Sequence, residues 1–289
     1  MTTPRNSRKV GAKRVYEWRR AGAPLDEAPE VYWSVTTLIK GGLPSPALTF
    51  WAAKAVAEFA VANHAQVSQM VQAVRLVKDE KGFMRVTDPD TVQAAIDFLK
   101  GSPWRERDRK ADLGTAVHAV AEAHALGVAM PAVAEEAKPY IATFQQFLED
   151  WKPRFIMAEA TVYNRTLKYA GTLDNIMEVD GLAPKPVKLI TDYKTSGSGV
   201  YPEAAMQLAM YRRAEFIGMP DGTEVPMPEV DGACVLWLRP DGYDFIPVMT
   251  DDDVFRSARY TIEVFRWAEE ISKRVIGQPL PAPKKVEAA

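Results

Sequence analysis

Cysteine is nearly absent from this chain of 289 residues, in which Cys234 is the single one. A disulfide within the chain needs two cysteines, and a four-cysteine metal site or iron–sulfur cluster needs four, so the chain alone can build none of these. A charge excess is also lacking, because 36 Lys and Arg stand against 38 Asp and Glu, a net charge of −2. Any nucleic-acid partner must therefore be attracted by local basic patches and not by the overall field.

Long apolar runs are missing as well. No run approaches the roughly eighteen consecutive apolar residues that a membrane-spanning helix needs, and no early apolar segment follows the basic N-terminus. We therefore expect a soluble, cytoplasmic protein with no membrane partner. The sequence also has no GxxxxGK[ST] phosphate-binding loop, which argues against an ATP-driven motor in this chain.

The two ends of the chain differ in composition from the rest. Residues 1–30 have one early acid, Glu17, against a set of basic residues: Arg5, Arg8, Lys9, Lys13, Arg14, Arg19 and Arg20. This composition predicts a flexible basic arm, which could either hold phosphates by charge or serve as a solvated tail. Residues 277–289, GQPLPAPKKVEAA, are rich in proline and predict a disordered tail.

Residues 31–153 predict a helical region after a short extended segment and a Gly/Pro turn. An Ala-rich helix is expected from Ser45 and Pro46, and a second helix in DPDTVQAAIDFLKG with Asp88 as its cap. The segment GTAVHAVAE predicts a third helix, on which His118 and Glu122 share a face four residues apart. On spacing alone, such a histidine is more often a core residue than a metal ligand.

Residues 154–276 predict strands followed by helices. Strand patterns occur in RFIMAEATVYN, KYAGTLDNIMEV, KLITDYKT, GACVLWLRP and YDFIPVM. Helices are expected from about Pro202 to Gly218 and after the acidic cluster at 251–253. The chain is therefore predicted to be α/β, with a mixed central β-sheet flanked by helices and an N-terminal helical region, and residues 31–276 are expected to form one structural unit.

Two strands and their connecting turn predict a metal site. Alternation in KLITDYKT puts Asp192 and Lys194 on one face and Tyr193 on the other. The turn DGLAPKP joins this strand to the preceding one, so Asp174 can lie beside Asp192. Carboxylate oxygens are ligands that Mg²⁺ and Mn²⁺ prefer, and a nearby lysine can orient or deprotonate a water molecule. Such a site suits hydrolysis of a phosphodiester bond.

These residues occur in the order of a known motif set. An acid on one strand (Asp174) precedes a D-X-K strand (Asp192-Tyr193-Lys194), a Q-X-X-X-Y helix (Gln207 and Tyr211) follows, and a helical histidine (His118) comes earlier. In this arrangement the chain resembles the PD-(D/E)XK nuclease superfamily, specifically its RecB-like branch, which includes phage exonucleases. Some members of that branch carry an iron–sulfur cluster, and this chain lacks the cysteines for one.

The resemblance implies roles for each residue. It implies a restriction-endonuclease-like core at 154–276 and Mg²⁺ or Mn²⁺ as the cofactor, held by Asp174, Asp192, the backbone carbonyl of Tyr193 and His118. Lys194 would orient or activate the attacking water, and Gln207 and Tyr211 would support the active-site geometry. Glu159 could be an additional metal-binding acid or a solvated glutamate at a strand edge.

The resemblance also implies a function. We expect a metal-dependent deoxyribonuclease, a phage-type exonuclease for DNA end processing or recombination that acts in the host cytoplasm. DNA would be its substrate, and a recombinase, a single-strand-binding protein or a helicase would be the candidate protein partners. Three alternatives stay open: a catalytically inactive DNA-binding or assembly subunit, a structure-selective endonuclease, and a ribonuclease. The last two stay open because the site residues recognise a phosphate and not the sugar or the strand end.

Overall fold

The computed structural model describes residues 6–24, 26–44, 46–72, 76–78, 80–86 and 89–280. Its elements, in chain order, are β1 (Ser7–Val10), β2 (Lys13–Trp18), β3 (Glu30–Ser34), α1 (Val35–Gly42), α2 (Pro46–Ala62), α3 (His64–Gln72), β4 (Leu76–Lys78), β5 (Met84–Val86), α4 (Pro89–Lys100), α5 (Ser102–Leu126), η1 (Glu135–Ala137), α6 (Lys138–Trp151), β6 (Arg154–Asn164), β7 (Tyr169–Val179), β8 (Val187–Lys194), α7 (Glu203–Arg212), β9 (Phe216–Gly218), β10 (Glu224–Pro226), β11 (Gly232–Arg239), β12 (Gly242–Pro247), α8 (Asp252–Arg266), η2 (Trp267–Ile271) and η3 (Ser272–Arg274). No helix within these ranges is both long and apolar enough to cross a membrane.

The central sheet is mixed, as predicted, and branches at β7. Among the described residues it has ten strands, with β1-β2-β3-β7-β6-β9-β10 as one path. β7 also pairs with β8, which pairs in parallel with β11, and β11 pairs with β12. A branched sheet of antiparallel and parallel pairs covered by helices confirms the predicted α/β class.

The branch leaves an opening along one edge of β7. Its parallel pairing with β3 ends at Ala170, and its antiparallel pairing with β8 begins at Asn175. β8 pairs with β7 only as far as Thr191, so residues 192–194 continue beyond the pairing. Asp174 and the D-X-K segment therefore lie at the point where the two strands diverge.

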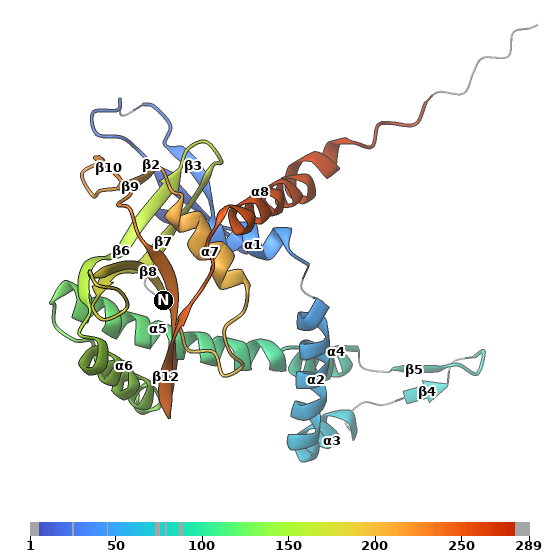
Figure 1. The fold of residues 1–289 in the computed structure, drawn as a ribbon. Coiled ribbons are helices and arrows are strands. Elements are labelled where there is room, and N and C mark those ends of the chain that lie inside the picture. Colours follow the sequence, from blue (N-terminus) through green and yellow to red (C-terminus); the bar gives the residue numbers. More distant parts are fainter. Residues whose placement is uncertain are drawn as a thin grey trace, which may run out of the picture.

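Helices cover both faces of this sheet (Figure 1). On β8, Ile190 packs into a core with α1, α7 and α8, whereas its neighbour Leu189 packs into a second core with α5 and α6. Alternate side chains of a strand point to opposite faces, which explains why adjacent residues join different cores. Gly41 and Gly42 end α1 without side chains, because a Cβ at either position would overlap Phe265 or Thr261 of α8.

The helices α2, α3 and α4 form a group away from the sheet (Figure 1). α5 has 25 residues, roughly 37 Å at 1.5 Å per residue, and reaches from this group to the underside of the sheet. The middle and C-terminal part of α5 packs under the sheet through Val117 and Ala121. α3 buries none of its described residues. The group therefore meets the rest of the molecule mainly through α5.

The prediction of a flexible basic arm over residues 1–30 is wrong for the part that the structure describes. Residues 7–10 and 13–18 form β1 and β2, and β2 pairs with β3, which joins β7. Tyr16 and Trp18 are buried in an aromatic core with Tyr32 and Tyr163. The sheet of the predicted 154–276 core therefore includes strands from before residue 154. The aromatic side chains of this basic segment are buried in the core, and their burial holds the segment in the sheet.

Two local expectations also change. Residues 35–42 form helix α1 instead of leading directly into a turn. The helix predicted to run to Gly218 ends at Arg212, because Phe216 and Ile217 form strand β9, which pairs with β6 on one side and β10 on the other. The predicted caps Ser45 and Asp88, and the tail beyond residue 280, lie outside the described residues.

Candidate metal centre

Three residues from three elements offer ligand atoms to one point. They are His118 on α5, Glu159 on β6 and Asp174 on β7, and one ligand atom from each lies within 4.8 Å of the others. All three are partly exposed, so the group can be reached from solvent. Burial raises the pKa of Glu159, and the charges of Asp174 and then of Glu122, one helical turn after His118, raise it further, which places another acid nearby.

Glu159 has an unusual backbone for a residue in a strand. Its φ is +48°, while the pairs on either side, Ala158 with Asn175 and Ala160 with Leu173, keep the regular register. Asp174 is the residue that this register places opposite Glu159. A positive φ is uncommon for residues other than glycine and often marks functional sites. The irregular residue of β6 is thus the one that joins the metal-ligand group.

His118 contacts both acidic strands. Its Nδ1 lies 3.5 Å from Oδ1 of Asp174, and its Nε2 lies 3.1 Å from the carbonyl oxygen of Tyr193. A carbonyl oxygen only accepts hydrogen bonds, so Nε2 carries a proton in this arrangement. Burial lowers the pKa of His118, but the carboxylate of Asp174 outweighs burial and raises this pKa to about 9.

The D-X-K segment and the Q-X-X-X-Y helix meet beside this group. The carboxylate of Asp192 forms an ion pair with Lys194 and accepts a hydrogen bond from Nε2 of Gln207 at 3.1 Å. Nε2 of Gln207 also donates to the Tyr211 hydroxyl at 3.4 Å. Tyr193 packs with α5 and α6 on the other face, so the predicted alternation of Asp192, Tyr193 and Lys194 is observed.

A glycine makes room for the Tyr211 ring. A Cβ added to Gly171 of β7 would lie 2.4 Å from Cε1 of Tyr211 and 2.8 Å from its hydroxyl oxygen. Real Cβ atoms do not approach so closely, and both groups are buried. Gly171 therefore allows α7 to bring Gln207 and Tyr211 against β7.

Asp174 links the two halves of the site. Its Oδ2 accepts a hydrogen bond from the backbone N–H of Tyr193 at 2.7 Å, across the divergence of β7 and β8. Burial opposes its ionisation, yet His118 and Lys194 hold the pKa of Asp174 below its usual range. Burial also favours neutral Lys194, but Asp192 and Asp174 raise the pKa of that amine. Lys194 is therefore protonated at neutral pH.

The ligand set differs in part from the one predicted. His118, Glu159 and Asp174 lie together, whereas Asp192 is engaged by Lys194 and Gln207 and stands outside this group. The Tyr193 carbonyl, predicted as a ligand, accepts from His118. Burial raises the pKa of Asp192 although Lys194 opposes it, and the charge of Asp174 adds to the increase. Asp192 thus lies within electrostatic reach of the group.

Sequence reasoning missed Tyr16 of β2. The hydroxyls of Tyr16 and Thr172 are hydrogen-bonded at 3.1 Å, two residues from Asp174. Burial raises the pKa of Tyr16, Arg14 lowers it, and the charge of Glu159 raises it further, so Tyr16 lies near the metal-ligand group. The signal was present in KRVYEW, where Glu17 separates the aromatic residues Tyr16 and Trp18, but the surrounding basic residues favoured an arm.

No protein-family model matches the chain, and no curated protein matches it significantly.

Proposed function

We propose that this protein is a metal-dependent nuclease that hydrolyses phosphodiester bonds of DNA. The observation that supports this most is the position of His118, Glu159 and Asp174 within 4.8 Å of one another, at the strand divergence that also holds Asp192 and Lys194. A set of clustered acids with one histidine and one protonated lysine matches the needs of a divalent cation and a phosphate.

The donor set fits Mg²⁺ or Mn²⁺. Oxygen ligands suit both ions, and the imidazole of His118 makes Mn²⁺ at least as suitable as Mg²⁺. Burial, together with the charges of Asp174 and Glu122, raises the pKa of Glu159 to about 8, which shows that negative charge is crowded here. His118, Glu159 and Asp174 would hold the ion, with Asp192 in reach. When bound, such an ion lowers the pKa of a water molecule and polarises the phosphate.

The remaining residues act on the substrate and on one another. Lys194 is protonated and partly exposed, so its charge can stabilise negative charge that develops on the phosphate. A protonated amine is a poor proton acceptor, so of the two predicted roles the positioning and charge-stabilising role fits better than that of a general base. Gln207 fixes Asp192, and Tyr211 fixes Gln207.

The biological role is the finer part of the proposal. We propose a phage-type exonuclease for DNA end processing or recombination that works in the cytoplasm of the host cell. DNA is its main partner, and a recombinase, a single-strand-binding protein or a helicase would supply or use the processed ends. The support is the order and spacing of His118, Asp174, the D-X-K strand and the Q-X-X-X-Y helix.

The test uses end-labelled linear, circular, single-stranded and RNA substrates with Mg²⁺ or Mn²⁺. We expect cleavage of linear DNA from its ends. Asp174→Asn should abolish it, and Lys194→Met should reduce its rate by about two to four orders of magnitude while DNA binding persists. Asp241→Asn, at an exposed site, and Lys188→Met, on the same strand β8, are the matched controls and should retain activity.

Each outcome separates two functions. Metal-dependent cleavage of circular DNA identifies an endonuclease, and cleavage of RNA alone identifies a ribonuclease. DNA binding by the unaltered protein without cleavage under any of these conditions identifies an inactive DNA-binding subunit. If Asp174→Asn cleaved at the unaltered rate, the metal centre would lie elsewhere.

A further inference from the structure

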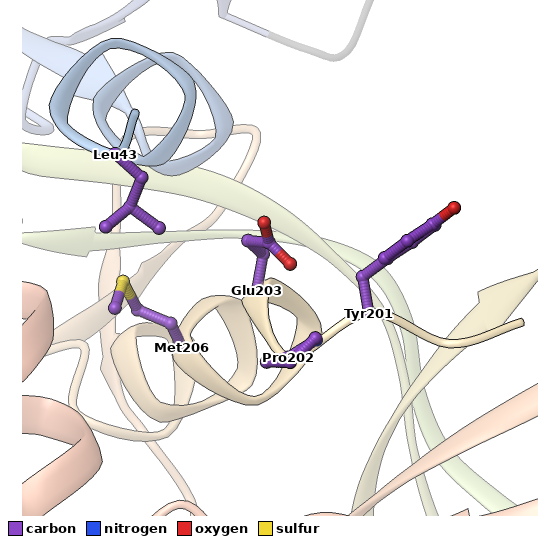
Figure 2. Close-up of a pocket in the computed structure, with 5 residues that line it drawn as sticks. All are labelled: Leu43, Tyr201, Pro202, Glu203 and Met206. Carbon is purple, nitrogen blue, oxygen red and sulfur yellow. The ribbon is translucent and has the colours of Figure 1, made fainter. Parts of the chain in front are cut away.

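Tyr201 stands between two hollows at the start of α7. The first has a volume of about 290 Å³ and is lined by Leu43, Tyr201, Pro202, Glu203 and Met206 (Figure 2). In that view the Tyr201 ring extends away from α7 and from the other lining residues. The second hollow has a volume of about 320 Å³ and shares Tyr201 and Pro202 with the first.

The second hollow lies beside the candidate metal centre. Trp237, which lines it, is the β11 residue that pairs with Lys194 of β8 in the parallel register. Paired residues of neighbouring strands project to the same face, so Trp237 and Lys194 are side by side. Its α7 wall is Ala205, on the same helix as Gln207, which holds Asp192. A molecule bound at Lys194 can therefore extend into this hollow.

The chemistry of the second hollow suits a flat, apolar group. Its walls include two aromatic residues, Tyr201 and Trp237, and the aliphatic side chains of Ile246 and Val248, and no charged residue lines it. Tyr201 is 56% exposed, so much of its ring is open to a partner. The guanidinium of Arg239 lies 4.1 Å from the centroid of the Trp237 ring and covers one face of it. The remaining walls are apolar, and every nucleobase has a face that stacks on aromatic rings.

Two hydrogen bonds hold the aromatic walls in place. The Trp237 indole N–H donates to the carbonyl of Ser196 at 2.7 Å, which fixes the segment after β8 against β11. The hydroxyls of Tyr201 and Ser198 are hydrogen-bonded at 2.7 Å. A ring held in this way loses little freedom when a base stacks on it.

We propose that the hollow between Tyr201 and Trp237 binds one nucleobase of a single nucleic-acid strand, from the nucleotide next to the phosphate held at Lys194. This inference rests on the proposed nuclease function and adds to it a binding site for the base. Stacking of this kind is tolerant of sequence, so the site would favour unpaired nucleotides over particular bases.

The experiment measures binding of short fluorescent single strands to the full chain by anisotropy, with Ca²⁺ in place of Mg²⁺ to keep the strand intact. One strand is complete, and the others each carry one abasic position. For the unaltered protein, we expect one abasic position to weaken binding about 5- to 150-fold, the equivalent of about 1–3 kcal/mol. Tyr201→Ala should weaken binding of the complete strand by a similar factor. This variant should then bind the complete strand and the abasic strand with the same affinity.

Two variants serve as controls. Tyr201→Phe keeps the ring and should retain most of the sensitivity to the abasic position. Tyr260→Ala removes a tyrosine of α8 that is 67% exposed and should bind like the unaltered protein. The inference is overturned if Tyr201→Ala binds the complete strand with unaltered affinity, or if it remains as sensitive to the abasic position as the unaltered protein. If the unaltered protein neither binds nor cleaves any nucleic acid, the proposed function fails, and this inference fails with it.

Discussion

Glu159 combines backbone strain with a candidate functional role. A residue other than glycine with φ at +48° costs on the order of 1–3 kcal/mol, and the surrounding β6–β7 pairing holds it in that conformation. The same residue brings its carboxylate to His118 and Asp174, where burial and then the charge of Asp174 raise its pKa to about 8. Both features destabilise the fold, which is typical of a residue retained for binding.

Glu159→Gly should therefore stabilise the protein and weaken metal binding. Glycine adopts positive φ without steric cost, and the change removes a carboxylate next to Asp174. We expect the free energy of unfolding in urea, measured without metal, to rise by about 1 kcal/mol. The increase in melting temperature caused by Mn²⁺ should fall, because a ligand stabilises the folded state less when it binds less tightly.

Glu178→Gly is the matched control for this prediction. Glu178 lies on β7 in the regular part of the β6 pairing, opposite Arg154, and its backbone is not among the positive-φ residues of the described chain. Glycine there should lower the free energy of unfolding by about 0.5–1 kcal/mol and leave the Mn²⁺ effect unchanged. A destabilised Glu159→Gly with an undiminished Mn²⁺ effect would contradict both parts of the argument.

At the scale of elements, strand β2 belongs to the core of the molecule. Trp18 is 2% exposed, and its ring packs against Tyr163 and Phe216 with centroid distances of 5.1 and 5.8 Å. Its indole N–H donates to Glu224 of β10 at 2.9 Å. β2 thus joins the N-terminal hairpin to strands that lie some two hundred residues further along the chain.

Trp18→Ala should be strongly destabilising. Truncation of a buried tryptophan costs about 3–5 kcal/mol, and here it also leaves Glu224 without this donor. Trp267, which is 52% exposed, is the matched control, and Trp267→Ala should change the free energy of unfolding by less than about 0.5 kcal/mol. Urea denaturation followed by circular dichroism measures both. Equal, small effects would show that residues 7–18 are the free arm that composition predicts.

An ion-pair cluster joins three elements at the same end of the sheet. Arg165, in the turn between β6 and β7, donates to Glu30 of β3 and to Glu224 of β10, with a shortest N to O distance of 2.7 Å. Burial opposes ionisation of Glu30, but hydrogen bonds from Arg165 and Tyr32 outweigh burial and lower the pKa of Glu30 to about 2. The cluster therefore needs Glu30 in its ionised form.

This pKa fixes the sign of a pH effect on stability. The pKa of Glu30 is lower in the folded protein than its ordinary value of about 4.5, so its contribution is complete above that value and is lost as the pH falls towards 2. We expect the urea midpoint to fall over this interval, and less steeply in Glu30→Gln than in the unaltered protein. Equal slopes would show that Glu30 contributes nothing to the acid sensitivity.

At the scale of the whole molecule, the sheet with its two helical layers contrasts with the α2–α4 group. The largest fully buried side chains lie on the sheet strands β3, β6, β7 and β8 and on the helices α1, α6, α7 and α8 that cover them, whereas Phe50, Val61 and Val71 on α2 and α3 are more than half exposed. α5 connects the two parts (Figure 1) and carries His118, which contacts the carbonyl of Tyr193 on β8. The metal-ligand group is thus held by the better-packed part.

Hydrogen exchange should report this contrast. Amides of α2 and α3 have few buried apolar neighbours, so they open at low free energy, whereas those of β6–β8 and β11 open only when the protein unfolds. We expect peptides from 46–72 to exchange within seconds to minutes, and peptides from β7 and β8 to stay protected for hours. Uniform protection across both parts would show that α2 and α3 are as stable as the sheet.

The sequence by itself determined the local elements of the site. Alternation in KLITDYKT set Asp192 and Lys194 on one face and Tyr193 on the other, and the spacing of Gln207 and Tyr211 set them on one face of a helix. These are consequences of strand and helix periodicity, which depend only on neighbours along the chain. The α/β class followed from the same patterns.

Only the tertiary structure decided which residues meet. The branch of the sheet at β7 engages Asp192 with Lys194 and Gln207 and gathers Glu159 with His118 and Asp174. The left-handed backbone at Glu159 and the partners that bury Tyr16 and Trp18 depend on pairing with distant strands, which the local sequence does not specify. From composition, residues 1–30 were predicted to be a basic arm. The aromatic partners that hold Tyr16 and Trp18 include Tyr163 and Phe216, and contacts between such distant segments exist only in the folded chain.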